Sequence, residues 1–170
     1  MGAVVLAAGA IIALAWLGHR PDPSLVRFEA VGIMLAIPPD TVTEVVVSQG
    51  ERRWRFERAP SKVWTAAHGQ PLAESASSRV ESGLRFLHVS APQRVLQRDE
   101  VAGIPPSEFG LEPPRFSVSV RSRGAAPFDI EFGGRNPQGL AQYARLAGRA
   151  EILLLPGFIG EQWESVMKAR

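Results

Sequence analysis

The 170-residue chain contains no cysteine. It can therefore form no disulfide, offers no thiolate nucleophile and cannot hold a metal through sulfur. Lysine is nearly as scarce, with two lysines against seventeen arginines, and the formal net charge is only +2. A balance so close to neutral gives no electrostatic case for nucleic acid, and we expect no nucleic-acid partner. The lack of cysteine is compatible with both a periplasmic and a cytoplasmic domain.

Residues that carry chemistry are also sparse. The three histidines, His19, His68 and His88, stand far apart, and none has a histidine or carboxylate at metal-ligand spacing. The sequence shows no Gly-x-Ser-x-Gly elbow and no dinucleotide or phosphate loop. We therefore predict no catalytic, cofactor-binding or metal-binding residues, and a protein that is not an enzyme. A hydrolase with ligands scattered along the chain is a further alternative.

Charge is missing from residues 2–18, a run of small and apolar side chains. As a helix this run would be ~26 Å long, slightly short of a ~30 Å hydrocarbon core. We predict a transmembrane helix over residues 1–20, with Trp16 and Arg20 as interfacial anchors. A cleaved signal peptide ending near Ala13-Leu14-Ala15 is the alternative, but it would lack a basic amino-terminal region.

Small residues recur four positions apart in this segment, at Ala3 and Ala7 and again at Gly9 and Ala13. Such spacing lets two helices approach closely in lipid. We predict that these four residues pack against helices of integral membrane protein subunits, so that the partners are those subunits and the lipid bilayer. The positive charges near the helix are too few to determine its orientation.

Prolines separate the apolar run from the rest of the chain. Residues 21–39 begin with Pro21 and end at Pro38 and Pro39, which interrupt regular structure, and we predict a juxtamembrane connector there. Residues 31–37 within it could form a strand or an interfacial segment. Residues 40–170 are predicted to form a soluble α+β domain.

The most regular pattern lies in residues 115–121 and 128–132, where apolar and polar side chains alternate. A period of two predicts two half-buried strands, and the Gly124-containing connection predicts an antiparallel hairpin. Arg115 and Arg121 would face Asp129 and Glu131 on the exposed side. Residues 133–137, which begin with two glycines, are predicted to be a loop.

Similar reasoning places the other elements. In residues 52–58, Trp54 and Phe56 are expected to face inward and Arg53, Arg55 and Glu57 outward. An apolar stripe at steps of three and four predicts a helix over residues 71–88, with Glu81 and Arg85 as an ion pair. Further strands are predicted at 41–48, 62–66, 94–98, 142–146 and 150–155, a helical turn at 105–109, and a helix from 159 to 167.

These elements define the predicted fold class: α+β, with an N-terminal transmembrane helix followed by a mostly antiparallel sheet with helices packed on one face. The arginines on exposed strand positions are the candidate contact surface. They are Arg53, Arg55, Arg115 and Arg121.

Three phrases carry a resemblance to a known family: Lys62-Val63-Trp64-Thr65, then Phe109-Gly110-Leu111-Glu112-Pro113-Pro114 before the hairpin, then Tyr143-Ala144-Arg145-Leu146-Ala147-Gly148. In this order they resemble the bacterial domain of unknown function 4340 family, over residues 40–167. The chain departs from the family in lacking a proline soon after Trp64. The resemblance implies one membrane helix, an α+β domain outside the cytoplasm, an association with ABC-type exporters in several bacteria, and no catalytic residues.

The sequence therefore predicts a non-catalytic, single-pass accessory subunit of the bacterial inner membrane, with a periplasmic domain that mediates protein–protein contacts in a larger membrane complex. The alternative is an extracytoplasmic ligand-binding module, auxiliary to an ABC-type transporter.

Overall fold

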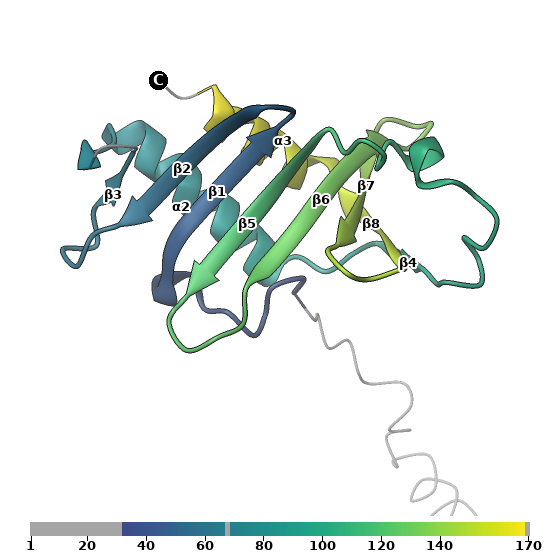
Figure 1. The fold of residues 1–170 in the computed structure, drawn as a ribbon, viewed down its shortest axis with the longest axis horizontal. Helices are drawn as coiled ribbons and strands as arrows, with labels where there is room; N and C mark the ends of the chain where they lie inside the picture. Colours follow the sequence, from purple (N-terminus) through teal and green to yellow (C-terminus); the bar gives the residue numbers. More distant parts are fainter. Residues whose placement is uncertain (1–31, 67–68, 169–170) are drawn as a thin grey trace, which may run out of the picture.

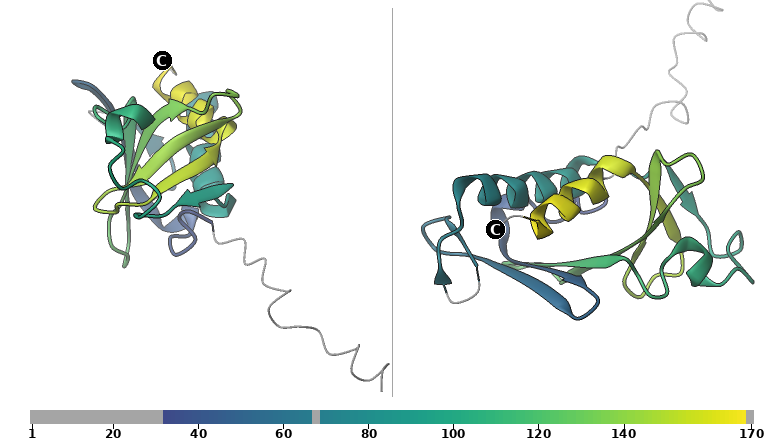
Figure 2. Two further views of the ribbon diagram at one scale, coloured as in Figure 1. Left: turned by 90° about the vertical axis from the view of Figure 1, so that its right-hand side faces the viewer. Right: turned by 90° about the horizontal axis from the view of Figure 1, so that it is seen from above.

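A computed structural model describes residues 32–66 and 69–168. Eight strands form one antiparallel sheet in the order β3-β2-β1-β5-β6-β7-β8-β4 (Figure 1). The strands are β1 (Val42–Gln49), β2 (Arg52–Arg58), β3 (Trp64–Thr65), β4 (Arg94–Leu96), β5 (Phe116–Ser122), β6 (Phe128–Arg135), β7 (Ala141–Leu146) and β8 (Ile152–Pro156). Helices α2 (Glu74–Val89) and α3 (Gly157–Met167) lie side by side on one face of this sheet (Figure 2).

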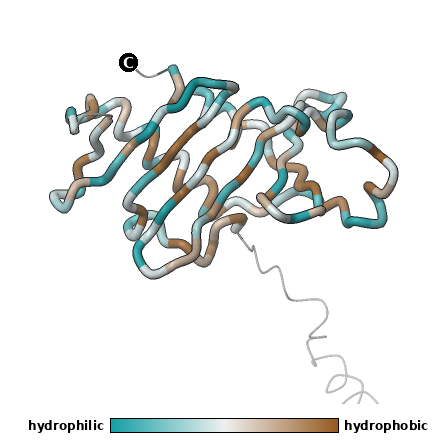
Figure 3. Tube along the Cα trace, in the orientation of Figure 1, coloured by the Kyte–Doolittle hydropathy of each residue, from teal (hydrophilic) through white to brown (hydrophobic). Residues whose placement is uncertain are grey.

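The strands form where apolar residues recur with a period of two, which places every second side chain under the helices. Figure 3 shows this alternation as bands of opposite hydropathy along the central strands. Val45, Val118 and Ile130 are fully buried and lie on adjacent strands of the sheet. Phe116 and Phe132 stack across β5 and β6 with ring centroids 4.6 Å apart. The hairpin predicted from the alternation is confirmed.

Helix α2 crosses behind the sheet, because the chain leaves it in β3 at one edge and returns in β4 at the other (Figure 1). Its buried stripe consists of Ala76, Val80, Gly83, Leu84 and Leu87. The helix begins three residues later than predicted, since Pro71 forms a β-bridge with Thr65 and the Leu72 N–H donates to the Trp64 carbonyl.

Helix α3 packs against α2 through Trp163, which is fully buried. A Cβ atom on Gly83 of α2 would lie 2.9 Å from the Trp163 ring. Glycine at this position therefore lets the two helices approach closely enough to enclose the indole. Ile159 and Val166 extend the same buried side of α3.

The two glycines after Phe132 belong to β6, not to the predicted loop. A Cβ on Gly133 would stand 2.2 Å from the Phe109 carbonyl oxygen and 3.0 Å from the Leu111 side chain. Phe109 ends a short 3-10 helix, η3 (Pro106–Phe109). The glycine is thus a point of close backbone approach within a strand, where η3 and Leu111 dock on the sheet.

The predicted fold class is wrong as stated. The described part of the chain is mostly an eight-stranded antiparallel sheet with two α-helices, and none of its helices is long and apolar enough to cross a membrane. The longer of these two helices, α2, has sixteen residues and is apolar along one stripe only. The predicted membrane segment, residues 1–20, lies outside the described residues.

Candidate functional site

The face of the sheet turned away from α2 and α3 is polar across its central strands. Its rows follow from the register: Arg53 lies opposite Ser48, Ser48 opposite Ser117, and Ser117 opposite Glu131. We call this surface the open face. It consists of Glu44, Val46, Ser48, Arg53, Arg55, Glu57, Ser117, Ser119, Arg121, Asp129, Glu131 and Arg145.

Three arginines of the open face bind carboxylates on their own or neighbouring strands. The N–O distances are 2.8 Å for Arg55–Glu44, 2.8 Å for Arg55–Glu57, 3.1 Å for Arg121–Asp129 and 2.8 Å for Arg145–Glu131. Since the side chains are partly exposed, each pair contributes about 0.2–1 kcal/mol. The pairs therefore favour this register more than they stabilise the fold.

Three of the four arginines predicted as a contact surface come together here: Arg53, Arg55 and Arg121. Arg115 does not join them, because it reaches Glu164 of α3 at 3.3 Å. The prediction missed Arg145, which binds the Glu131 carboxylate. The signal for Arg145 was its alternation with Ala144 and Leu146 in the predicted strand 142–146, which places it on the exposed side.

The middle of the open face carries short side chains. Ser48, Ser117 and Ser119 lie on the adjacent strands β1 and β5, with arginines on the β2 side and carboxylates on the β6 side. Serine hydroxyls both donate and accept hydrogen bonds. Together with charges of both signs, they suit contact with a polar protein surface. At one end, Phe109 meets Tyr143 edge to face at 5.1 Å, where η3 limits this face.

The described residues hold no group of three His, Asp or Glu side chains that could bind a metal ion. Outside the open face, the pKa of Glu100 is lowered, first by the Gln97 N–H at 2.8 Å and then by Arg94. These contacts tie Glu100 to the chain beside β4 and give it no neighbour on the open face.

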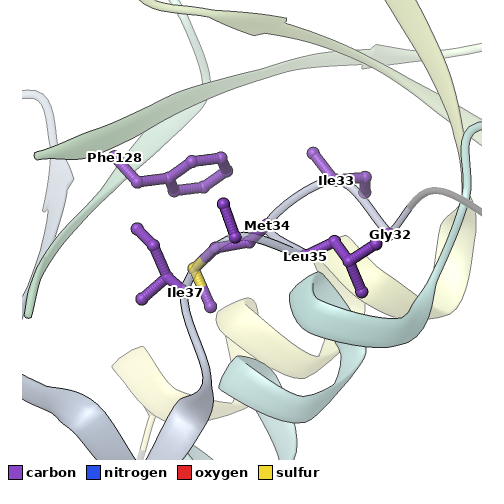
Figure 4. Close-up of a pocket in the computed structure, with 7 residues that line it drawn as sticks. Gly32, Ile33, Met34, Leu35, Ile37 and Phe128 are labelled. Atoms are coloured by element: carbon purple, nitrogen blue, oxygen red, sulfur yellow. The ribbon is translucent and has the colours of Figure 1, made fainter. Parts of the chain in front are cut away.

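A second feature is an apolar pocket of ≈ 440 Å³. Figure 4 shows its lining side chains, which gather where the described chain begins. Met34 and Ile37 are buried, whereas Leu35 is 50% exposed. The lining, which we call the Gly32 pocket, is Gly32, Ile33, Met34, Leu35, Ala36, Ile37 and Phe128.

The segment that forms this pocket is fastened to the end of α2. The Met34 N–H donates to the Leu87 carbonyl at 2.9 Å, and the Ile33 N–H to the Ser90 carbonyl at 3.0 Å. A Cβ on Gly32 would collide with the His88 carbonyl oxygen at 1.7 Å, so only glycine fits. Residues 33–36 form turns, not the strand that was one of the two alternatives from the sequence. The other alternative, an interfacial segment, stays a prediction.

A buried arginine joins β2 and β3 to α2. Arg58, with 8% of its side chain exposed, binds the Glu81 carboxylate and lies over the Trp64 ring, 4.5 Å from its centroid. The Trp64 Nε1–H donates to the same carboxylate at 2.8 Å, and Arg58 donates to the Pro39 carbonyl at 2.8 Å. Glu81 thus pairs with Arg58 and not with the predicted Arg85. The cluster holds elements together and faces neither the open face nor the Gly32 pocket.

The predicted helix-packing and anchoring residues lie outside the described residues, and their roles remain predictions. They are Ala3, Ala7, Gly9, Ala13, Trp16 and Arg20. His19 and His68 also lie outside.

The described fold and its open face define a domain with an antiparallel sheet whose two α-helices both lie on one side. Comparison with models of known protein families found no match, and comparisons with curated proteins and with solved structures found none either. The resemblance to the domain of unknown function 4340 family therefore stays a prediction.

Proposed function

We propose that this protein is a non-catalytic accessory subunit whose folded domain mediates protein–protein contacts within a larger bacterial membrane complex. The observation that carries the proposal is the open face, which extends over β2, β1, β5, β6 and β7. Its ion pairs bring arginines and carboxylates of neighbouring strands together. Neighbouring charges of both signs suit a specific polar contact, because complementary charges on a partner fix its register.

The location of this subunit is proposed to be the bacterial inner membrane, with a single pass and a periplasmic domain. This part rests on the uncharged run of residues 2–18. The proposed partners are integral membrane protein subunits. The half-exposed Leu35 and the Gly32 pocket, which lie where the described chain begins, suit a position close to such subunits.

Site-specific photo-crosslinking in intact cells tests the proposal. A photo-reactive amino acid replaces Ser119 on the open face, and in a matched control it replaces Ser78, an exposed residue of α2. We expect Ser119 to give crosslinks to an integral membrane subunit, identified by mass spectrometry, and Ser78 to give none. No crosslink from Ser119, or the same products from both positions, would overturn it.

The Gly32 pocket supports a second candidate, an extracytoplasmic module that binds a small apolar ligand. Its volume of ≈ 440 Å³ lies within the roughly 300–1,000 Å³ of small-molecule sites. Native mass spectrometry of the purified protein should then show an adduct that disappears when Ala36→Trp fills the pocket. A spectrum of the unliganded mass alone contradicts this candidate.

A further inference from the structure

Strand β2 has an outer edge that is only partly covered. Strand β3 is two residues long and pairs with Glu57 and Arg58 alone. Along residues 52–56, β2 pairs with β1 on its inner side and with no strand of the described chain on its outer side. Figure 1 shows β2 running past the short β3 along this side of the sheet.

The backbone groups on that edge follow from the hairpin geometry. The turn between β1 and β2 has two residues, so Gln49 and Arg52 form its closing pair and exchange hydrogen bonds. Because the direction of these groups alternates along a strand, Arg53 and Arg55 turn their N–H and C=O groups outward. Ala59 follows the same alternation, and its N–H donates outward to the Val63 carbonyl at 2.9 Å.

The side chains on this edge are strongly basic. Strand β2 has four arginines and one glutamate in seven residues. Arg55 is bound by Glu44 and Glu57, but the cross-strand neighbour of Arg53 is the uncharged Ser48. Arg53 is exposed and has no carboxylate in ion-pair range among the described residues. On the open-face side of this edge, it is a charge that a partner can still neutralise.

This distribution of charge selects between possible occupants of the edge. A second copy pairing antiparallel through its own β2 would bring arginines opposite arginines, which is destabilising. Acidic side chains opposite Arg53 would be stabilising for the same reason. Trp54 lies on the other face of the sheet and is half-buried beside the core. The residue of the partner strand opposite Trp54 would therefore have an apolar neighbour.

We propose that the edge of β2 over residues 52–56 binds, by β-strand addition, an extended segment of a partner protein in which acidic and apolar residues alternate. Backbone hydrogen bonds to Arg53 and Arg55 supply the attachment, and the alternating side chains supply the selectivity. The inference rests on the proposed protein–protein function and names the chemistry of one partner segment.

The test uses a synthetic peptide, acetyl-Ser-Glu-Val-Glu-Val-Glu-Ser-amide, and the same peptide with lysine in place of glutamate. The full chain, ¹⁵N-labelled, is titrated with each peptide and followed by NMR. We expect the acidic peptide to shift the amide signals of Arg53 and Arg55 and to slow their hydrogen exchange. The basic peptide should leave both signals unchanged.

Variants separate the backbone contribution from the charge. Arg53→Ala removes the charge and keeps the N–H, and it is the reference for Arg53→Pro. Arg53→Pro removes the charge together with an outward N–H that the sheet does not use, at a position where edge strands accept proline. It should weaken binding of the acidic peptide at least about tenfold. Arg53→Glu keeps the N–H and should shift the preference toward the basic peptide. Arg123→Glu, the same charge change at an exposed residue of the β5–β6 turn, is the matched control and should bind like the parent.

Three results would overturn the proposal: no response of the Arg53 and Arg55 amides, equal binding of the two peptides, or unchanged selectivity in Arg53→Glu. The last of these decides the matter even if Arg53→Pro does not fold. The crosslinking from Ser119 does not depend on this edge. Crosslinks without peptide binding would therefore reject the strand addition and leave the proposed function standing.

Discussion

Arg58 shows what one charged residue needs in order to lie inside this domain. Its guanidinium has a carboxylate, a backbone carbonyl and an aromatic face as neighbours, from Glu81, Pro39 and Trp64. A buried charge is costly unless its hydrogen-bonding groups are satisfied. Glu81 is more exposed than Arg58, so water screens the pair from one side. Removing Glu81 should therefore lower the free energy of unfolding by less than breaking a fully buried ion pair would.

At the residue scale we expect Glu81→Ala to destabilise the domain by about 1–3 kcal/mol, because the Trp64 indole loses its acceptor and Arg58 keeps only the Pro39 carbonyl. Chemical denaturation measures the loss. Arg85→Ala is the control, since this residue lies one turn further along α2 and is exposed; its effect should stay within about 0.5 kcal/mol. If the two variants unfold at the same denaturant concentration, Glu81 does not have this role.

At the element scale, the two adjacent glycines of β6 offer a direct comparison. Gly133→Ala would place a methyl group 2.2 Å from the Phe109 carbonyl oxygen, whereas at Gly134 the nearest atom is 3.5 Å away, an ordinary contact. We expect Gly133→Ala to cost about 1–3 kcal/mol or more through overpacking. Gly134→Ala should cost clearly less.

Thermal unfolding ranks the two variants, and hydrogen exchange locates the change. In Gly133→Ala the amides of Gly110 and Leu111, which donate to η3 carbonyls, should exchange faster than in the parent. Equal unfolding midpoints for both alanine variants would mean that η3 docks on the sheet without needing a glycine at position 133.

Individual strands could be predicted from the sequence because a period of two is a local signal. The alternation in residues 115–121 and 128–132 places Val118, Val120 and Ile130 on the buried side, and the structure confirms it. Alternation determines the face of a side chain but not the neighbouring strand. The pairing of β1 with β5, which lies far along the chain, could therefore not be predicted.

Positions on the candidate site were also predictable from alternation along single strands, but their tertiary neighbours were not. Exposed positions on single strands identified Arg53, Arg55 and Arg121. The partners of charged residues depend on tertiary contacts, so Glu81 was assigned to Arg85 by helical spacing although Arg58 binds it. Arg115 likewise turns to Glu164, on a helix whose position over the sheet is not encoded locally.

At the scale of the whole molecule, we expect stability to fall from the centre of the sheet to its edges. Strands β1, β5 and β6 have a strand on each side, whereas β3 and β4 are short and end the sheet. Amides in the central strands should exchange at rates close to those set by global unfolding. Amides in β3 and β4 should exchange at least about tenfold faster. Hydrogen exchange followed by NMR measures both, and equal protection of β4 and β5 would contradict the expectation.

The path of α2 behind the sheet has a consequence for how the domain assembles. The part of the chain up to β4 forms strands β3, β2 and β1 at one end of the sheet and β4 at the other end. The part from β5 onward forms the strands between them. The two parts therefore meet at two seams, β1 with β5 and β4 with β8. Neither part can complete its hydrogen bonding before the other arrives. Contacts between residues far apart in sequence must form late and together, which is typical of slowly folding, strongly cooperative domains.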